Sequence, residues 1–496
     1  MAGGGISEAG AQYSRVVGLM YVFNLIVGTG ALTMPKAFSE AGWLLSLITI
    51  IILSFMSFLT VTFVTEAMGV ANAVLKGGQH VRSVSINDDE VTDERKPLLD
   101  PVPTLNAGTS VNIGTSNPFE ITERTELGQM AGMFFNRAGI LFFNICIAIY
   151  LYGDLAIYGA AVPKTLRDIS CTYNVPTINS SDCGNSTVLA DSDPCWNSSH
   201  LTRMGMYRIC VAGFFVLLGG FTFFNVQKTK YLQYLTSLSR WIAFGMMIVL
   251  AVIRISKKQG QGHPSVATIG GVPNLFGVCV YAFMCHHSLP SLITPIRNKS
   301  KLYNLLAADY LLILLFYVLV SFTGIYAFQE IDDLYTLNFF QPDACDESKS
   351  ITRVKFIQYF LALFPVFTLS TNFPIISITL RNNLKAVCYN EKRPYTFFVD
   401  RIVFPLVALI PPFGIALATN KVEFLVGITG SYAGAGIQYI IPALLVFYAR
   451  RQTAPSMAVE NVHRSPFRGY LWIIFVCVWA VLCMIFVTVN HIISRK

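Results

Sequence analysis

The chain has 496 residues, of which 53% are hydrophobic and only 13% are charged, and its mean hydropathy is +0.54. Soluble globular proteins carry about 25% charged residues, so this composition excludes an ordinary water-soluble fold. The net charge of +8 does not indicate nucleic-acid binding, because the basic residues are scattered among loops instead of forming one patch.

Apolar runs of about 20 residues recur along the chain, and each is long enough to cross a bilayer core of about 30 Å. We therefore predict an all-α polytopic membrane protein with about eleven transmembrane helices. The amino-terminal sequence MAGGGISEAGAQYSR lacks the pattern of a cleaved signal peptide, so the first span is expected to be retained. The predicted spans are 16–37, 43–65, 139–162, 206–226, 232–253, 273–295, 306–328, 354–380, 399–419, 422–449 and 471–491.

An odd number of spans places the two termini on opposite faces of the membrane. A cytosolic amino terminus assigns more Lys and Arg to the cytosolic loops than to the lumenal loops, which is the expected bias. The predicted organisation is a cytosolic N-terminus (1–15), helices one and two (16–69), a disordered cytosolic loop (70–135), helices three to ten (136–449) with a lumenal loop (164–205), and a cytosolic linker with helix eleven (450–496).

The first span contains the sequence NLIVGTGALTMP, in which Gly28, Gly30 and Pro35 weaken a helix. From Val16 to Gly28 is about 18 Å of helix, which places the weak point near the middle of the bilayer. Unpaired backbone groups are costly in hydrocarbon, so an unwound segment survives only against protein or a polar cavity. Taken alone, this span is explained either by a simple kink or by a break that binds a solute.

The loop 70–135 is polar and rich in Ser, Thr, Asn and Pro, which predicts a disordered linker. Its sequence DERKPLLD contains Glu94, Leu98 and Leu99 at the spacing of an acidic dileucine signal, an address that clathrin adaptors read. We expect delivery to the lysosomal or late-endosomal membrane. The alternative is an ordinary polar tether in a protein of the plasma membrane.

Asp154 lies inside the third span. An ionisable residue within a membrane helix is rare and by default functional. Two roles stay open for this carboxyl group: a proton carrier, or the ionic partner of Arg240 in the fifth span.

The loop after the third span holds three N-x-S/T sequences, at Asn179, Asn185 and Asn197. Such sites are glycosylated only on the lumenal side, which is where the predicted topology places this loop. Asn298 begins a fourth such sequence, but it falls on the cytosolic face and is expected to stay unmodified.

Four cysteines are predicted to lie in the lumen: Cys171, Cys183 and Cys195 in that same loop, and Cys345 in the loop after the seventh span. An even number of cysteines in an oxidising compartment predicts disulfide bonds, and four cysteines leave three pairings open. Free thiols are the alternative.

The sixth span, VYAFMCHHSLPSLITP, is interrupted by His286, His287, Ser288 and Pro290. If the chain consists of two five-span halves, the first and sixth spans are equivalent, and paired interruptions indicate a substrate site at the midplane. The first N–H groups of a half-helix attract an anion, whereas carbonyl groups without donors suit an ammonium group or Na⁺. A zwitterion such as an α-amino acid matches both.

The sequence Cys285-His286-His287 does not predict an enzyme. Neighbouring residues on a helix point about 100° apart, so adjacency does not bring the thiol onto an imidazole base. The three residues also lack the fourth ligand and the spacing of a zinc site. A proton-sensitive histidine at this position, or a histidine that only caps the break, both remain open.

Four motifs together resemble the amino acid/auxin permease family: NLIVGTGALTMP in span one, YGDLAIYG in span three, YAFMCHHSLP in span six and FTLSTNFPIISITLRNNL in span eight. The resemblance implies the five-plus-five inverted repeat of the amino acid–polyamine–organocation fold, plus one extra helix. The substrate-binding residues that it implies are Gly28, Thr29, Gly30, Tyr281, Phe283, Cys285 and His286. The candidates for coupling to an ion, Na⁺ or H⁺, are Asn24, Thr368, Ser370, Thr371 and Asp154.

We therefore expect a secondary active transporter that moves neutral amino acids or similar small zwitterions by alternating access, in symport with Na⁺ or H⁺. The alternative is a non-transporting amino acid sensor of the lysosomal membrane that signals through its cytosolic loop. Neither an enzyme activity nor a bound cofactor or metal is predicted. The expected partners are the amino acid, the lipid bilayer and clathrin adaptors, and not nucleic acid.

Replacing Leu98 and Leu99 together by alanine should move the protein toward the cell surface, because the adaptor would lose both leucine side chains that it recognises. Surface biotinylation and fluorescence microscopy measure the redistribution. An unchanged intracellular distribution would show that DERKPLLD is not a sorting signal.

Overall fold

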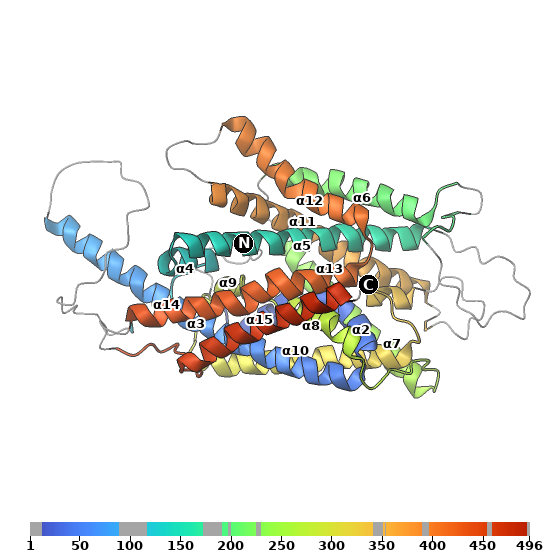
Figure 1. Cartoon of the computed structure of the whole chain (residues 1–496), viewed down its shortest axis with the longest axis horizontal. Coiled ribbons are helices and arrows are strands. Elements are labelled where there is room, and N and C mark those ends of the chain that lie inside the picture. The colour runs from blue at the N-terminus through green and yellow to red at the C-terminus, as the bar shows by residue number, and fades with distance from the viewer. Residues whose placement is uncertain are drawn as a thin grey trace, which may run out of the picture.

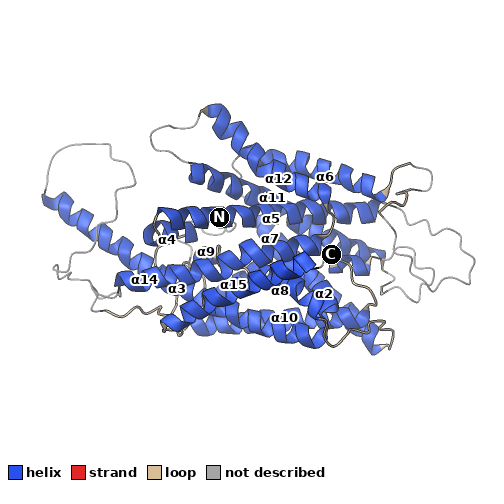
Figure 2. Cartoon of the chain, in the orientation of Figure 1, coloured by secondary structure: helices blue, strands red, loops and turns tan. Residues whose placement is uncertain are grey.

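The computed structural model describes residues 12–88, 117–171, 191–196, 200–224, 230–340, 351–352, 354–388, 396–453 and 459–493. All regular secondary structure in these segments is helical (Figure 2). The predicted glycosylation sites (Asn179, Asn185, Asn197), two of the cysteines (Cys183, Cys345) and the sorting residues (Glu94, Leu98, Leu99) lie outside the described residues.

Within the described chain, nine helices are long and apolar enough to cross a membrane without a break. They are α3 (Trp43–Asp88), α5 (Arg137–Ser170), α6 (Arg203–Gly219), α7 (Lys230–Ser256), α10 (Leu302–Ala327), α11 (Lys355–Cys388), α12 (Phe404–Ala418), α13 (Val422–Thr429) continued through π-helical turns by α14 (Ile441–Thr453), and α15 (Tyr470–Ile493).

Two further segments are interrupted, namely α1 (Arg15–Ile26) with α2 (Thr29–Ala41), and α8 (Val272–Ala282) with α9 (Leu289–Ile293). They coincide with the predicted spans one and six. The prediction of an all-α polytopic membrane protein is confirmed. In the described residues the bent pair α1–α2 brings the candidate spans to ten, and Ile269–Ala282 is a shorter apolar helix, so the eleventh span stays a prediction.

The predicted disordered loop 70–135 is too long at both ends. Helix α3 continues to Asp88, and α4 (Leu127–Phe134) forms beyond residue 117. The Asn72 side chain explains part of this order, because its oxygen accepts the backbone N–H groups of Thr122 (3.0 Å) and Glu123 (2.8 Å). A buried amide on α3 therefore holds the returning chain, a long-range contact that local composition does not reveal.

The two interrupted segments run in opposite directions. Tyr13, just before α1, pairs through its backbone with Ile296, just after α9. At the other end, the N–H group of Thr268 before α8 donates to the carbonyl of Ala41, the last residue of α2. The two interrupted segments are therefore antiparallel to each other, as an inverted repeat requires of its first and sixth spans.

The helices form two groups, of which α5, α6, α11 and α12 lie in the upper part of Figure 1 and α2, α3, α8 and α10 in the lower part. Helices α5, α6, α11 and α12 pack on one another, and we call them the four-helix group. Helices α2, α3, α8 and α10 pack together with α1 and α9, and we call them the broken-helix group. Helix α7 contacts both groups, as does α13.

Helix α8 lies unusually close to α13. A Cβ atom at Gly277 would lie 1.9 Å from the carbonyl oxygen of Gly427, and one at Gly430 would lie 1.9 Å from the oxygen of Gly277. Small residues let membrane helices approach to backbone contact, where no hydrophobic effect drives them together. The position of α8 beside the second interruption is therefore fixed by glycine.

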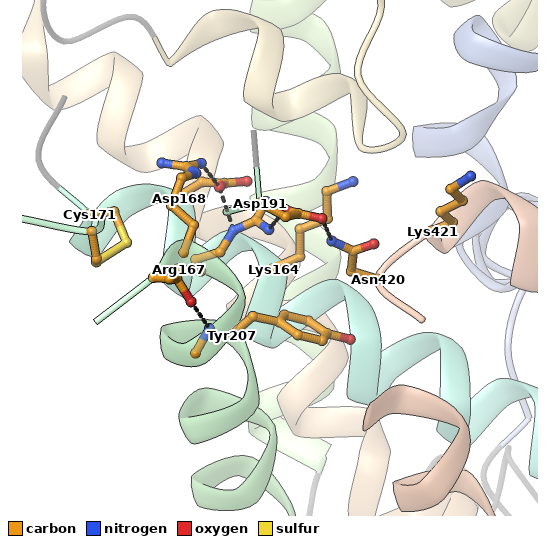
Figure 3. Close-up of polar contacts among 12 residues, drawn as sticks. Lys164, Arg167, Asp168, Cys171, Asp191, Tyr207, Asn420 and Lys421 are labelled. Carbon is orange, nitrogen blue, oxygen red and sulfur yellow. Dashed lines mark hydrogen bonds and ion pairs between the residues drawn. A yellow bond between two sulfur atoms is a disulfide. The ribbon is translucent and has the colours of Figure 1, made fainter. Parts of the chain in front are cut away.

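At one end of the molecule, a charged network fastens the four-helix group (Figure 3). Asp168 accepts from Arg167 (2.8 Å) and Arg203 (2.5 Å), which joins α5 to α6. Arg167 also reaches Asp191 (2.7 Å), whose other oxygen accepts from Asn420 (2.8 Å) between α12 and α13. We call this the disulfide end.

A disulfide bond at this end joins Cys171 to Cys195. It confirms that a disulfide bond forms among the four cysteines named from the sequence, and it selects one of the pairings that the sequence left open; the two cysteines have a sequence separation of 24. The bond places the chain around Asp191 against the end of α5 (Figure 3).

At the opposite end, Glu66 of α3 forms a two-pronged ion pair with Arg450 of α14, with N···O distances of 2.9 and 2.7 Å. The same carboxylate accepts the N–H group of Ser465 (3.0 Å), and Arg450 also donates to the carbonyl of Phe467 (3.0 Å). The pair therefore ties α3, α14 and the segment before α15 together. We call this the Arg450 end.

Replacing Glu66 by alanine should lower the free energy of unfolding by about 3 kcal/mol, because breaking a buried pair leaves a charge without its carboxylate. The side chains are 10% and 4% exposed for Arg450 and Glu66. Thermal unfolding in detergent measures the effect. Glu460→Ala is the matched control, since its pair with Arg464 is exposed and should contribute below about 1 kcal/mol. Equal melting temperatures for the two variants would contradict the assignment.

Candidate functional site

The predicted interruption of the first span is confirmed. Helix α1 ends at Ile26, α2 begins at Thr29, and the two are bent by 56°. Twelve residues of α1 correspond to about 18 Å, so the break lies near the middle of a core of about 30 Å. Gly28 stands at the start of α2 without a side chain to cap its first N–H groups. The first N–H groups of a helix have no carbonyl partner four residues earlier within that helix. Here the N–H group of Ala31 donates to the carbonyl of Gly28 (3.1 Å), and those of Thr29 and Gly30 lie at the break.

The second interruption is also confirmed. Helix α8 ends at Ala282, and α9 begins at Leu289, with Pro290 as its second residue. Residues 283–288 form tight backbone turns, in which the N–H groups of Met284 and Ser288 donate to carbonyls three residues earlier. A proline at the start of α9 removes a donor that would have no partner there.

The two breaks touch each other. A Cβ atom at Gly30 would lie only 2.6 Å from the Cα of Ala282, so α2 rests directly on the end of α8. The hydroxyl of Tyr317 on α10 lies 2.9 Å from the carbonyl oxygens of both Ile26 and Ala282. These are the last residues of α1 and α8, so one buried hydroxyl serves the open carbonyl ends of both breaks.

A cavity of about 200 Å³ opens beside the breaks, between the broken-helix group and helices α5, α7 and α11. Its wall combines the backbone of Gly28 to Gly30 with aromatic and hydroxyl side chains. Ligand pockets of drug-like size measure about 300–1,000 Å³, so this one suits a smaller solute. The walls come from both helix groups.

Two groups of opposite charge line the cavity. Asp154 of α5 is 6% exposed, the Tyr281 hydroxyl faces its carboxylate, and one carboxylate oxygen has no hydrogen-bond partner in the described part of the chain. Arg240 of α7 donates to the carbonyl oxygen of Asn24. A guanidinium has five donors, so several remain for a solute.

The expected alternative of an Asp154–Arg240 ion pair is wrong, since the salt bridges among the described residues do not include it. The break explains the difference. In a continuous helix the carbonyl of Asn24 would accept from the N–H group four residues later, at Gly28. That residue lies outside α1, and the freed carbonyl takes Arg240 instead.

Seven of the residues proposed from the sequence do line the cavity. Four were proposed for the substrate and three for a coupling ion: Gly28, Thr29, Gly30 and Tyr281, and Asn24, Asp154 and Thr368.

Phe283, Cys285 and His286 are not among the residues that line the cavity. Phe283 stacks on Tyr310 of α10, with ring centroids 6.0 Å apart. The Cys285 thiol lies 3.2 Å from the same tyrosine hydroxyl, and the His286 ring lies 2.8 Å from Thr60 of α3. Within this turn, the residues that line the cavity are Met284, His287 and Ser288.

Ser370 and Thr371 are likewise absent from the cavity lining. The Thr371 hydroxyl donates to the carbonyl of Thr368 on its own helix (2.9 Å). Asn372 takes the place facing the cavity. The prediction that α11 forms a wall of the cavity is correct, but the face of the helix that points into the cavity differs from the predicted one.

Sequence reasoning missed Tyr150 and Tyr158, which line the cavity on either side of Asp154. The signal was present, because spacings of four residues place all three on one face of a helix. It also missed Arg240 as a cavity residue and named it only as a partner for Asp154.

The family model for transmembrane amino acid transporter proteins matches residues 12–82 and 118–493. The chain belongs to the transmembrane amino acid transporter family. The resemblance drawn from the four motifs is thereby confirmed, and the chain is a multi-pass integral membrane protein. The internal unmatched interval, 83–117, begins within the last turns of α3 and ends before α4.

Relatives in this family cover the chain from end to end. Transmembrane protein 104 of Homo sapiens is 52% identical over 513 residues, 99% of each chain. The Transmembrane protein 104 homolog of Drosophila melanogaster is 44% identical, over 97% of this chain and 98% of its own. The homolog of Dictyostelium discoideum is 33% identical over the full length of both.

Two alanine substitutions separate the roles of the glycines in the first break. Gly30→Ala should lower stability by about 1–3 kcal/mol, because the new methyl group meets the Ala282 backbone. Gly28→Ala should fold normally, since its nearest neighbour would be the Ile26 oxygen at 4.0 Å, yet it narrows the cavity and should reduce amino acid uptake.

Thermal unfolding and uptake into proteoliposomes, measured on both variants, test this contrast. A destabilised Gly28→Ala protein, or a Gly28→Ala protein with unchanged uptake, would contradict the placement of Gly28 at the cavity wall.

Proposed function

We propose that this protein is a secondary active transporter that moves neutral amino acids or similar small zwitterions by alternating access. The observation that carries the proposal is one small cavity at two touching helix breaks, with a carboxylate and a guanidinium on its walls. Family membership supports a transport role and gives no support to an enzyme.

The two poles of a zwitterion match two regions of the cavity. A carboxylate is attracted by the first N–H groups of α2, at Thr29 and Gly30, and by the free donors of Arg240. An ammonium group is attracted by the Asp154 carboxylate, which keeps an oxygen without a partner in the described structure. The substrate thereby satisfies groups that would otherwise stay unpaired in hydrocarbon.

The volume of the cavity favours a small side chain. Its volume of about 200 Å³ lies below the range of about 300–1,000 Å³ for drug-sized ligand pockets, which favours a compact amino acid over a bulky one. Aromatic and aliphatic lining from Tyr150, Leu32 and Phe364 favours an uncharged side chain.

The division into two helix groups supports alternating access. The four-helix group is fastened by the Arg167–Asp168–Arg203 network at the disulfide end. The broken-helix group is held together by Tyr317 at the two breaks. Movement of one group against the other exposes the cavity to each side in turn while both breaks keep their partners.

Among the two coupling ions, the position of Arg240 favours H⁺ over Na⁺. Its guanidinium occupies the Asn24 carbonyl, one of the oxygens that the open end of α1 offers to a cation. Two positive charges at neighbouring positions repel each other strongly where water is scarce. Lysosomal or late-endosomal delivery through the dileucine sequence fits proton coupling, since those compartments are acidic.

A sensor is the second candidate, and the length of α3 is the observation that favours it. This helix runs without interruption from the broken-helix group to Asp88, and Asn72 fastens the returning chain to it. A movement of α3 on substrate binding would thus be transmitted to the segment that we expect in the cytosol. Binding without flux distinguishes this candidate from a transporter.

Uptake of labelled alanine, serine, glutamine and leucine into proteoliposomes tests the proposal. At least one of the four should accumulate, and Arg240→Ala should reduce its uptake about 10- to 100-fold, because a charge-assisted hydrogen bond contributes about 1.5–3 kcal/mol. The matched control is Arg464→Ala, which removes an exposed arginine.

Equal uptake by the Arg240 variant and the wild type would contradict the assignment of the carboxylate pole. Amino acid binding by correctly folded and oriented protein, with no uptake of any of the four, would favour the sensor.

A further inference from the structure

A second polar cluster lies on the far side of the second break, away from the substrate cavity. It is buried between α3, the turn 283–288 and α10. We call it the Asp309 cluster, and its members are Ser57, Thr60, Cys285, His286, Asp309 and Tyr310.

Hydrogen bonds connect this cluster to the second break. The Tyr310 hydroxyl lies 2.9 Å from the Ser57 hydroxyl and 3.2 Å from the Cys285 thiol. Ser57 also lies 3.3 Å from the carbonyl oxygen of Phe283, the first residue beyond α8. On its other side, Thr60 meets the His286 ring at 2.8 Å. The turn is therefore held by hydroxyl groups of α3 and α10.

Asp309 differs from the other members because it lacks a partner. It is 1% exposed, and neither of its carboxylate oxygens has a hydrogen-bond partner in the described residues. An isolated ionised carboxylate in hydrocarbon is very costly, so such a group carries a proton or finds a new partner. Intramembrane carboxyl groups of this kind commonly serve proton relays.

The charged groups of the neighbouring helices are engaged elsewhere. The groups with which Asp309 interacts electrostatically are Cys285 and Tyr310. On α7, Arg240 interacts with Tyr317, two helical turns further along α10. His286 is engaged with Thr60.

The remaining charges on the packed helices lie at the two ends of the molecule. Glu66 of α3 pairs with Arg450. On α2, Lys36 lies 3.7 Å from Glu40, and Arg15 of α1 bonds the loop after α9. In the described part of the chain, the salt bridges therefore leave Asp309 without a cationic partner.

A cleft of about 180 Å³ lies at the Arg450 end, beside the start of the helix that carries this carboxyl group. It is lined by residues 299–304 at the start of α10 and by Val462 and His463. Asn304 precedes Asp309 by five residues, which is about 8 Å along a helix. Asp309 is not among the residues that line the cleft, but it lies nearer to the Arg450 end of α10 than to the other end of that helix.

His463, which lines this cleft, does not change its charge near neutral pH. Burial and the nearby Lys299 lower the pKa of His463 to about 4. Because its pKa is lowered, the ring is neutral above about pH 5 and gains its charge only in stronger acid. A change in transport between about pH 5 and about pH 7 therefore does not come from the titration of His463.

We propose that Asp309 is the residue that takes up and releases the coupled proton of the transport cycle. The proposal rests on the transport function proposed above and specifies its coupling group. A proton from the Arg450 side binds one Asp309 oxygen, and the neutral acid stays in the cluster. When the proton leaves, the carboxylate draws the hydroxyl of Tyr310 or Ser57, the same hydroxyls that hold the second break.

Proton release therefore competes with the contacts of Cys285 and Phe283, and this competition links Asp309 to the position of the turn 283–288. Besides the Asp309 carboxyl group, the cluster offers three hydroxyls, an imidazole and a thiol. The hydroxyls and the imidazole already bond one another or the turn 283–288, and a thiol suits softer metals than Na⁺, which selects oxygen ligands. These engaged hydroxyls favour a proton over Na⁺ at the carboxyl group.

The test uses full-length protein in proteoliposomes with a pH-sensitive dye trapped inside, and an amino acid of the four-member panel that the wild type accumulates. Asp309→Asn should lose amino acid-driven acidification about tenfold or more, yet exchange labelled for unlabelled amino acid within about twofold to threefold of wild type. Asp309→Glu should retain acidification. The matched control is Glu330→Gln, an exposed carboxylate beyond α10.

Acidification by Asp309→Asn at the wild-type rate would overturn the proposal, and so would loss of exchange together with acidification in a protein of normal thermal stability. Wild-type uptake without acidification would also overturn it while leaving the transport function intact. Absence of uptake by the wild type would remove the transport function itself, and the proton assignment with it.

Discussion

The structure depends on one constraint: backbone groups freed inside the bilayer must find partners within the protein. Both breaks meet it with side chains from other helices. Tyr317 reaches the carbonyls of Ile26 and Ala282, and Arg240 takes the carbonyl of Asn24. The N–H groups at the start of α2 are left to the cavity. A solute with a carboxylate would accept hydrogen bonds from these N–H groups, which the helices alone do not satisfy.

The same constraint explains why the molecule divides as it does. The Tyr317 contacts at the breaks lie within the broken-helix group, whereas the ion pairs of Asp168 at the disulfide end lie within the four-helix group. The cavity lies at the boundary between them, where Asp154 faces Tyr281. The contacts that stabilise each helix group are thus separate from the contacts between the groups, which must break and re-form when one group moves against the other.

The sequence predicted the spans and both breaks well, because length, glycine and proline act locally on a helix. The positions of Gly28 and Pro290 marked the interruptions. The four-residue spacing of Tyr150 and Tyr158 from Asp154 also marks a shared helix face, but that signal was missed. Direction within a turn is not local: His286 faces α3 and His287 the cavity because of contacts with Thr60 and Tyr150. The order around Asn72 and the partner of Arg240 likewise depend on residues far away in the chain.

The most direct measurement is an experimental structure, by electron cryo-microscopy in a lipid nanodisc, determined with and without a transported amino acid. The account predicts density for a small solute between the start of α2, Arg240 and Asp154, with both helices open at residues 27–28 and 283–288. Continuous helices through either position, or a solute bound away from the two breaks, would contradict it.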